Sequence, residues 1–301
     1  MSSAQYGSSA GTAPPVTCVV LNWNGWRETI PCLHSLAAQD YPALRVLVVD
    51  NASTDDSVQR IRESFPALEL LESPVNGGFA SGCNLGTLVA LERGAAFVWL
   101  LNNDTVAPPD TATKLVAAAS GARTGMVGTV LYYAHDPAKV QAWGGGSVAR
   151  WNGFGTHFLK PTLLGSNSYL TFASVLLRSE LLRDVGLLDE GFFMYFEDAD
   201  LCFRARAAGW QLVVATDTAV LHKEGGSALS HGSKKADRMV TTAGLRFLVR
   251  YGRPPALAQV LYVLSRLGRR AVRSQFASMR AVWRGVRDWR HNRPRGFEEE
   301  R

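Results

Sequence analysis

The chain has 301 residues, of which 47% are hydrophobic, and a formal net charge of +6 at pH 7. A chain of this length and composition can bury one large core or two small ones, which excludes disordered and fibrous proteins. Residues 1–15 lack both the basic region and the apolar region of a signal peptide. We therefore expect a flexible tail over residues 1–15 and a folded body in the cytoplasm.

The cysteines are far apart in the sequence, and each lies among apolar residues: Cys18, Cys32, Cys83 and Cys202. The sequence contains no CxxC pair of the kind that zinc sites use. Wide spacing also argues against a disulfide framework. We expect all of these cysteines to be buried, reduced thiols.

Basic residues are concentrated near the C-terminus. Residues 1–245 carry 18 Lys and Arg against 22 Asp and Glu, whereas residues 246–295 carry 13 Arg against one Asp. This break predicts two parts, a globular body over residues 16–245 and a basic helical extension over residues 246–301. Because the body is acidic and contains no nucleic-acid-binding motif, nucleic acid is not an expected partner.

The extension has the pattern of a basic amphipathic helix. On a helical wheel, arginines occupy one arc (Arg266, Arg269, Arg270, Arg273, Arg280, Arg284 and Arg287) and apolar residues the other (Val272, Phe276, Met279, Val282, Trp283, Val286 and Trp289). Its longest apolar run, residues 256–263, is too short to span a bilayer. We expect peripheral attachment to the anionic inner face of the plasma membrane. Packing on the body, or on the second subunit of a homodimer, is the alternative.

Within the body, short apolar runs alternate with helical patterns. The runs are rich in β-branched residues and mostly lack a polar face, which indicates strands buried on both sides: residues 16–21, 45–49, 67–71, 97–101 and 125–130. Helical patterns separate them, at residues 28–38, 55–64, 79–93 and 110–120. This βαβ order predicts a doubly wound, mostly parallel α/β sheet that binds its ligands at the carboxyl ends of the strands.

Polar residues follow three of these strands. Asn22 follows the first, Asp50 and Asn51 follow the second, and residues 102–104 (Asn-Asn-Asp) follow the fourth. The first strand lacks the GxGxxG fingerprint after it, and the glycine-rich residues 77–82 lack the lysine of a P-loop. The sheet is therefore expected to bind a nucleotide by other means. Asp50 can accept the imide N–H of uracil or thymine, or it can serve as a turn former.

Acids follow directly after the aromatic run of residues 192–196. Glu197, Asp198 and Asp200 suit the first turn of a helix, where the helix dipole favours negative charge. A charge-decorated helix, with Asp200 paired to Arg204 on its surface, is one interpretation. An active site is the other, and residues 102–104 and His222, which also end apolar runs, favour it.

These motifs, in this order, resemble the family-2 glycosyltransferases of the GT-A fold. The similarity covers roughly residues 16–230 and rests on residues 19–24, 48–55, 76–86, 101–105 and 188–210. Within that family the chain is most similar to rhamnosyltransferase-like members. The resemblance implies an inverting transfer of a sugar, rhamnose favoured, from a dTDP- or UDP-linked donor to a cell-surface glycan or a polyprenyl-linked acceptor.

The resemblance also implies a role for each site residue. Asp198 is the general base, and Glu197 supports it. Asp104 and His222 hold Mn²⁺ or Mg²⁺. The donor contacts are Leu21, Asn22, Asn24, Asp50, Asn51, Asn76, Gly78, Asn84, Asn102 and Asn103. Because Asn102 replaces the first acid of the family's usual Asp-x-Asp, a catalytically weak nucleotide-sugar-binding module of the same fold is the alternative.

Two further segments are assigned to substrates. Residues 132–165 are rich in glycine and aromatic residues, and we expect an irregular segment that binds the acceptor. Trp143 and Trp151 are its candidates for stacking on a sugar, and Tyr195 is a further acceptor contact. Residues 223–235 are expected to form a mobile lid over the diphosphate, or a passive linker.

Overall fold

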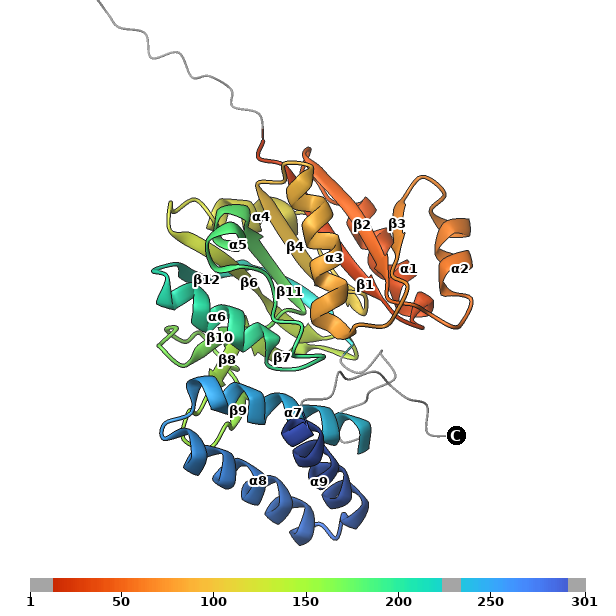
Figure 1. Cartoon of the computed structure of the whole chain (residues 1–301). Helices are drawn as coiled ribbons and strands as arrows, with labels where there is room; N and C mark the ends of the chain where they lie inside the picture. The colour runs from red at the N-terminus through yellow and green to blue at the C-terminus, as the bar shows by residue number, and fades with distance from the viewer. Residues whose placement is uncertain (1–12, 224–233, 292–301) are drawn as a thin grey trace, which may run out of the picture.

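The computed structural model describes residues 13–223 and 234–291. Most of the predicted tail over residues 1–15, and most of the predicted lid over residues 223–235, therefore lie outside the described residues. Figure 1 shows a central sheet with helices on both of its faces, and three C-terminal helices gathered beneath one end of it.

Parallel strands form the first half of the sheet, in the order β3-β2-β1-β4. Their bounds are β1 (Val16–Asn22), β2 (Leu44–Asp50), β3 (Glu69–Glu72) and β4 (Phe97–Asn102), and they alternate with α1 (Trp26–Ala37), α2 (Ser57–Ser64) and α3 (Gly78–Glu92). The predicted βαβ order and parallel sheet are confirmed. Asn22 pairs in register with Asp50, and Leu21 with Asn102, so the polar ends of these strands meet at one edge.

Beyond β4 the sheet becomes mixed. β11 (Ser174–Arg178) runs antiparallel between β4 and β6 (Thr124–Tyr133). β12 (Gln211–His222) then pairs parallel with β6, and the short β5 (Thr105–Val106) pairs antiparallel with the end of β12. β7 (Asp136–Trp143) pairs with β6 outside this path. The pairing of β5 with β12 matters for function because it joins two polar segments that are far apart in the sequence.

Residues 132–165, expected to be irregular, form strands over half of their length. After β7 the chain builds a small sheet in the order β10-β8-β9, from β8 (Gly145–Val148), β9 (Gly155–His157) and β10 (Ser168–Leu170). A Cβ atom at Gly145 would overlap the backbone of Tyr169. Glycine is therefore needed here for close pairing of strands, and the prediction of an irregular segment was wrong.

Side chains along each strand alternate between two cores, one on each face of the sheet. Val19 of β1 packs in the core beneath α3, α5 (Ser179–Val185) and α6 (Glu197–Ala207). Its neighbour Val20 packs in the core beneath α1, α2 and α4 (Thr111–Ala118). The cysteines are free and buried, as predicted.

Residues 234–291 form α7 (Lys234–Tyr251), α8 (Pro255–Val272) and α9 (Phe276–His291). The predicted boundary at residue 245 lies inside α7, and Phe247 and Tyr262 share a core with α3 and α6. The change in charge at residue 245 is therefore a change in surface composition, whereas the hydrophobic core continues past this position. The prediction of one amphipathic helix was also wrong, because the chain leaves the helix after Val272. Within the described residues, no helix is long and apolar enough to cross a membrane.

Candidate active site

A cavity of about 290 Å³ opens at the carboxyl ends of β1 and β4. Of the residues predicted from the sequence, it is lined by Leu21, Asn51, Asn76, Gly78, Asn102, Asn103, Asp104, Tyr195, Glu197, Asp198 and His222. The fold therefore brings the predicted nucleotide, metal and base residues to one place, although they come from segments up to 201 positions apart, between Leu21 and His222.

Asp104 and His222 lie side by side in this cavity. The antiparallel pairing of β5 with β12 sets Thr105 opposite His222, which places Asp104 next to the imidazole ring. Its Oδ1 is 3.1 Å from Nε2 of His222, and both side chains are largely buried. Nδ2 of Asn102 is 3.5 Å from the same ring nitrogen. Among the described residues, no three His, Cys, Asp or Glu side chains are grouped so that they could hold a metal ion, so a metal at this pair would need further ligands.

Gln141 of β7 orients the His222 ring. Its Oε1 is 2.7 Å from Nδ1 of His222 and can only accept a proton, so Nδ1 carries the hydrogen. In the neutral ring, Nε2 then presents a lone pair toward the Asp104 carboxylate. Two electron-pair donors at this separation suit a divalent cation.

Asn51 contributes an acceptor without a partner to the cavity wall. Its Nδ2 donates to Oδ1 of Asn76 (3.0 Å) and to the carbonyl of Gly78 (3.1 Å), which fixes the amide. Its Oδ1 is buried and has no hydrogen-bond partner among the described residues. An orphaned acceptor costs free energy unless a ligand donates to it. The Asn51 oxygen is therefore a candidate acceptor for an N–H or O–H of a ligand.

Gly78 lets the start of α3 approach the aromatic run of residues 192–196. Its φ of +87° favours glycine, and an added Cβ would overlap the Phe193 backbone. The amide of Phe79 donates to the Phe193 carbonyl at 2.7 Å. Tyr195 and Phe196 also have positive φ, 74° and 68°, directly before α6. Non-glycine residues adopt this conformation at a cost and recur at functional sites.

Asp50 supports the cavity from behind and does not line it. Its carboxylate accepts from Nδ2 of Asn22 (2.7 Å) and from the amide and hydroxyl of Ser53 (2.8 and 2.6 Å), and it is only 2% exposed. The oxygen of the Asn22 amide in turn accepts from Thr29, whose hydroxyl accepts from Asn103. The turn-former interpretation of Asp50 describes these hydrogen bonds, and its contact with a nucleobase stays a prediction.

Four other predicted residues lie away from the cavity. Asn24 accepts from the amide of Thr54 at 2.7 Å and ties two loops together. Asn84 of α3 exchanges hydrogen bonds with the backbone of Leu188. Trp143 and Trp151 do not line this cavity or a second cavity that adjoins it beside α8, and Trp151 is 60% exposed. Polar turn residues and aromatic residues are common in such structural roles, which the sequence alone cannot separate from ligand contacts.

Glu197 and Asp198 open α6 at the edge of the cavity. Burial raises the pKa of Asp198 to about 7, although the amide of Ala199 donates to its Oδ1 at 2.7 Å. Burial, followed by the Asp198 charge, raises the pKa of Glu197 well above its usual value. Oε2 of Glu197 is buried and has no hydrogen-bond partner within the described residues. Asp198 is the more accessible acid and is poised to take a proton near neutral pH.

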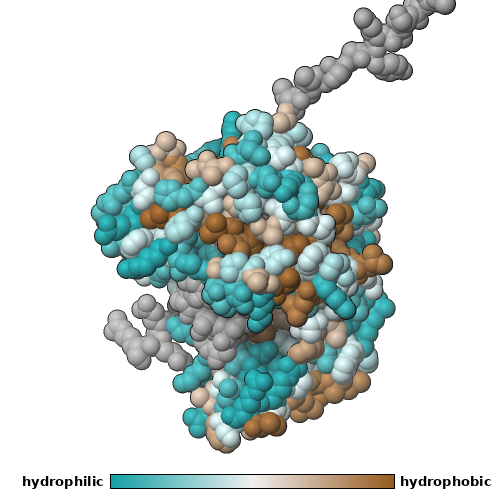
Figure 2. Space-filling view, turned by 180° about the vertical axis from the view of Figure 1, so that it is seen from behind, coloured by the Kyte–Doolittle hydropathy of each residue, from teal (hydrophilic) through white to brown (hydrophobic). Residues whose placement is uncertain are grey.

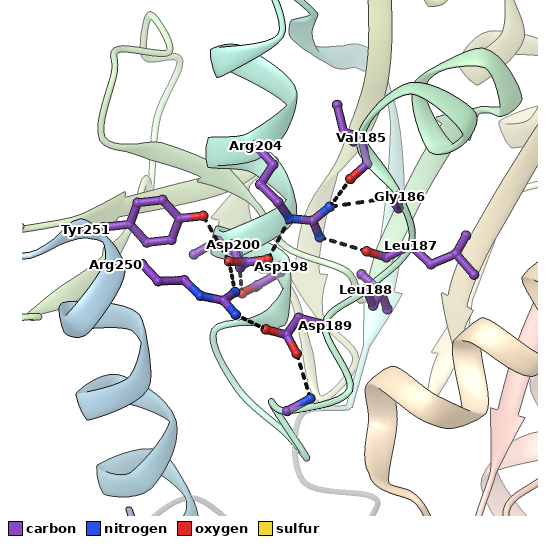
Figure 3. A network of polar contacts seen from close by, with 12 residues as sticks. Val185, Gly186, Leu187, Leu188, Asp189, Asp198, Asp200, Arg204, Arg250 and Tyr251 are labelled. Atoms are coloured by element: carbon purple, nitrogen blue, oxygen red, sulfur yellow. Dashed lines mark hydrogen bonds and ion pairs between the residues drawn. The ribbon is translucent and has the colours of Figure 1, made fainter.

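Asp200 plays a different part from the one expected. Figure 3 shows its carboxylate at the centre of a polar network that joins α6 to α7. It accepts from Arg204 (2.8 Å), Arg250 (3.0 Å) and the hydroxyl of Tyr251 (2.9 Å), and it is fully buried. Arg250 also pairs with Asp189 at 2.6 Å. The expectation of a surface pair with Arg204 alone was wrong, because α7 covers this side of α6.

Several lining residues had not been predicted, among them Trp23, Gln141, Phe193 and Met194, whereas His157 belongs to the segment predicted to bind the acceptor. Trp23 lies between two predicted residues and Phe193 within the aromatic run, so position pointed to both. Gln141 carried no signal, because the strand that holds it had not been recognised.

The comparisons with known proteins agree with this architecture. Residues 14–242 match the family described as glycosyltransferase like family 2, so the chain belongs to that family and is a glycosyltransferase. It is 28% identical, over 63% of this chain and 70% of the relative, to N-acetylglucosaminyl-diphospho-decaprenol L-rhamnosyltransferase of Mycobacterium tuberculosis. It is 26% identical, over 70% of this chain and 17% of the relative, to the O-antigen biosynthesis protein RfbC of Myxococcus xanthus.

Solved structures share the fold. Staphylococcus aureus TarS residues 1–349, in complex with UDP-GlcNAc, superpose with a TM-score of 0.60 at 18% identity, over 92% of this chain and 81% of that one. The mannosyltransferase PcManGT of Pyrobaculum calidifontis, in complex with GDP-Man and Mn²⁺, gives 0.58 at 20% identity, over 92% and 76%. The predicted GT-A fold is thereby confirmed.

Proposed function

We propose that the protein is an inverting, metal-assisted glycosyltransferase with Asp198 as its general base. It transfers a sugar, rhamnose favoured, from a dTDP- or UDP-linked donor to a hydroxyl of a cell-surface glycan or polyprenyl-linked acceptor. One observation carries this proposal: a single cavity is lined both by the Asp104–His222 pair and by a carboxyl whose pKa is raised to about 7.

The donor is assigned to the side of the cavity that β1 and β4 form. Asn51, with its orphaned acceptor, and Trp23 are placed to contact the nucleoside. Asp104 and His222 would hold a divalent metal, which when bound stabilises the negative charge of the leaving diphosphate. Two GT-A neighbours are in complex with Mn²⁺, which supports a metal at this point.

Asp198 is assigned the proton of the acceptor. As the acceptor oxygen bonds to the anomeric carbon, the bond from that carbon to the phosphate oxygen breaks, and the nucleoside diphosphate leaves with the electron pair. The hydroxyl proton passes to the Asp198 carboxylate. A base with a pKa near the operating pH serves this purpose best. Attack from the face opposite the leaving group inverts the anomeric configuration.

The acceptor assignment draws on a relative. The Mycobacterium tuberculosis protein is named for transfer of L-rhamnose to N-acetylglucosaminyl-diphospho-decaprenol, a lipid-linked acceptor. We propose the same classes of sugar and acceptor for this chain, and hence action at the inner face of the plasma membrane.

The outer face of α8 suits an anionic membrane. Leu257, Val260 and Leu264 recur at helical spacing and are 52%, 54% and 58% exposed. Val272 and Phe276 extend this apolar stripe, and exposed arginines such as Arg253 and Arg273 lie near its ends. Figure 2 shows apolar residues along the lower edge of the molecule, where the C-terminal helices lie. Apolar side chains flanked by arginines are the composition of a helix that lies in the lipid interface.

A donor screen tests the proposal. Full-length protein with Mn²⁺ is incubated with UDP-, dTDP- and GDP-linked sugars and an acceptor that carries a sugar diphosphate on a short prenyl chain, and the product is analysed by NMR. We expect transfer from one nucleotide sugar, with the anomeric configuration inverted. Transfer with retention would refute a single displacement by Asp198, and binding of a nucleotide sugar without any transfer would favour the non-catalytic alternative.

A further inference from the structure

A second cavity, of about 610 Å³, adjoins the first. The two share His157, Tyr195, Glu197 and Asp198 in their linings. The β8–β9 hairpin forms one wall, the start of α6 the back, and α7 with α8 the opposite wall. The general base proposed above is therefore reachable from both cavities, and a molecule in the second one can present a hydroxyl to Asp198.

The wall that α8 contributes is strongly positive. Arg266, Arg269, Arg270 and Arg273 all line the second cavity. They recur at helical spacing, so they share one side of α8 and are spread over about 10 Å of its length. Four guanidinium groups along one cavity wall are an arrangement that proteins use to bind phosphate groups.

The nearby carboxylate neutralises only part of this charge. Asp237 of α7, 5% exposed, accepts from Arg266 (3.0 Å) and from Arg270 (2.9 Å). Among the described residues, neither Arg269 nor Arg273 pairs with an acid. Arg269 instead lies 4.0 Å from the centre of the Phe154 ring, which holds it toward the hairpin. Arg266 and Arg270 share one anion, and Arg269 and Arg273 have none within the part of the chain that the structure describes, so the wall that α8 contributes carries an excess of positive charge.

The remainder of the lining suits a sugar and the first part of a hydrocarbon chain. Tyr195, Phe154 and Tyr262 contribute aromatic surfaces, and Tyr262 is buried beneath the arginines. Aromatic faces pack against the C–H surfaces of sugars and prenyl chains. The exposed apolar stripe of α8 lies on the opposite side of that helix and does not line the cavity.

We propose that the second cavity binds the diphosphate ester of the acceptor, with Arg269 and Arg273 as its ligands alongside Arg266 and Arg270. This inference rests on the proposed function, because it assumes that Asp198 receives the acceptor's proton. The donor's diphosphate is assigned to the Asp104–His222 pair in the first cavity. The two diphosphates thus have separate sites, one with a metal pair and one with arginines, on either side of α6's first turn.

The test compares acceptors with and without the diphosphate. One acceptor is a sugar diphosphate on a short prenyl chain, and the other is the same sugar on an uncharged alkyl chain. For the double variant Arg269→Gln/Arg273→Gln we expect the KM of the diphosphate acceptor to rise about 10- to 100-fold, the usual effect of losing charged hydrogen bonds. The KM values of the alkyl glycoside and of the donor should stay unchanged.

Arg280→Gln/Arg287→Gln is the matched control. It removes the same charge from α9, at positions that do not line the cavity, and should leave every KM unchanged. Melting temperatures of all variants establish that they remain folded. An equal rise in KM for both acceptors, or an equal effect of the α9 control, would overturn the proposal.

A binding measurement separates this inference from the proposed function. Calorimetric titration with farnesyl diphosphate and with inorganic pyrophosphate, in EDTA and without donor, needs no turnover. We expect farnesyl diphosphate to bind more tightly and to lose about 10-fold or more in affinity in Arg269→Gln/Arg273→Gln, but not in Asp104→Asn. Equal affinity for inorganic pyrophosphate would assign the arginines to a free anion, and sensitivity to Asp104→Asn alone would return the ligand to the first cavity. If farnesyl diphosphate binds as expected while no nucleotide sugar supports transfer, the proposed function is refuted, whereas the phosphate-binding site is supported.

Discussion

Arg250 of α7 donates to the carboxylate of Asp200 in α6 at 3.0 Å, across 50 positions of sequence. Asp200 follows the proposed base Asp198 by two residues and is fully buried. Tyr251 donates to the same carboxylate, and Phe247 of α7 packs against the rings of Phe196 and Phe203. The C-terminal helices therefore hold the helix that presents the proposed base Asp198.

Asp200→Asn should lower the free energy of unfolding by about 3 kcal/mol, because it leaves the guanidinium groups of Arg204 and Arg250 without their shared anion. The partial exposure of both arginines keeps the effect at the lower end of the range for broken buried pairs. Urea unfolding followed by circular dichroism measures it. The exposed Asp217→Asn is the control and should change stability little. Equal stability of the two variants would show that the network adds nothing to the fold.

Asp198→Asn should reduce turnover about 10²- to 10⁴-fold, the usual loss when a general base is removed, while donor affinity stays unchanged. In the wild-type protein, kcat/KM should rise with pH, with an inflection near pH 7 and a plateau above it, because Asp198 must lose its proton before it can act as a base. The variant should lack that inflection. Full activity in Asp198→Asn, together with an inactive Glu197→Gln variant, would assign the general base to Glu197.

The same group should make stability fall as pH rises. An aspartate in the unfolded chain loses its proton near pH 3.8, whereas folded Asp198 keeps its proton to about pH 7. Between these values the unfolded state binds fewer protons, so the free energy of unfolding decreases with increasing pH. Asp198→Asn should match the wild-type protein near pH 4 and exceed its stability at pH 8. Denaturant midpoints across this range measure the difference in stability between variant and wild type, with Asp217→Asn again as control. A difference that is the same at pH 4 and pH 8 would contradict the prediction.

Asp104→Ala and His222→Ala should each abolish the metal dependence of donor binding and leave the protein folded. Gln141→Leu should weaken metal binding about 10- to 100-fold, because the His222 ring loses the partner that fixes its tautomer. Calorimetric titration with Mn²⁺ reports both effects. His135→Ala removes an exposed imidazole elsewhere and should have no effect. Unaltered Mn²⁺ affinity in Asp104→Ala would rule out the proposed ligand pair.

Leu257→Gln/Leu264→Gln should reduce binding to vesicles of phosphatidylglycerol and phosphatidylethanolamine at least about 10-fold, because two large apolar side chains no longer leave water. Flotation of the full-length protein measures it. The control Leu88→Gln/Leu163→Gln alters two exposed leucines outside the C-terminal helices. Binding that survives in the α8 variant, or that is equally strong on uncharged phosphatidylcholine vesicles, would argue against an anionic membrane as partner.

The sequence predicted those site residues that have a polar or titratable side chain and also lie at the end of a strand. Residues 102–104 and His222 end apolar runs, and strand ends of an α/β sheet meet at one edge, so their proximity followed from the pattern. Asp50 also ends a strand, yet its carboxylate accepts from the backbone of its own loop at Ser53. Asn84, predicted as a donor contact, lies within α3 and exchanges hydrogen bonds with the backbone of Leu188. A polar side chain at a strand or helix end can serve a ligand or the backbone, and only the three-dimensional arrangement decides between these roles.

The C-terminal helices show the limit of reasoning from charge. A helical wheel places Arg266 and Arg270 on a face expected to meet water or lipid, yet both turn inward because the buried Asp237 lies on the neighbouring helix. Asp237 is far from them in sequence, and nothing in its local context marks it as buried. For the same reason the break in composition at residue 245 did not mark the end of a folding unit.

Because the hydrophobic core continues past residue 245, truncation of the protein at that position removes part of the core. A chain cut at the change in composition would lose Phe247, Arg250 and Tyr251 together. The aromatic rings of Phe196 and Phe203 would then be exposed to solvent, and the Asp200 carboxylate would keep Arg204 alone. Such a fragment should aggregate. The cause would be the loss of the contacts that α7 makes with α6, and not poor expression of the protein.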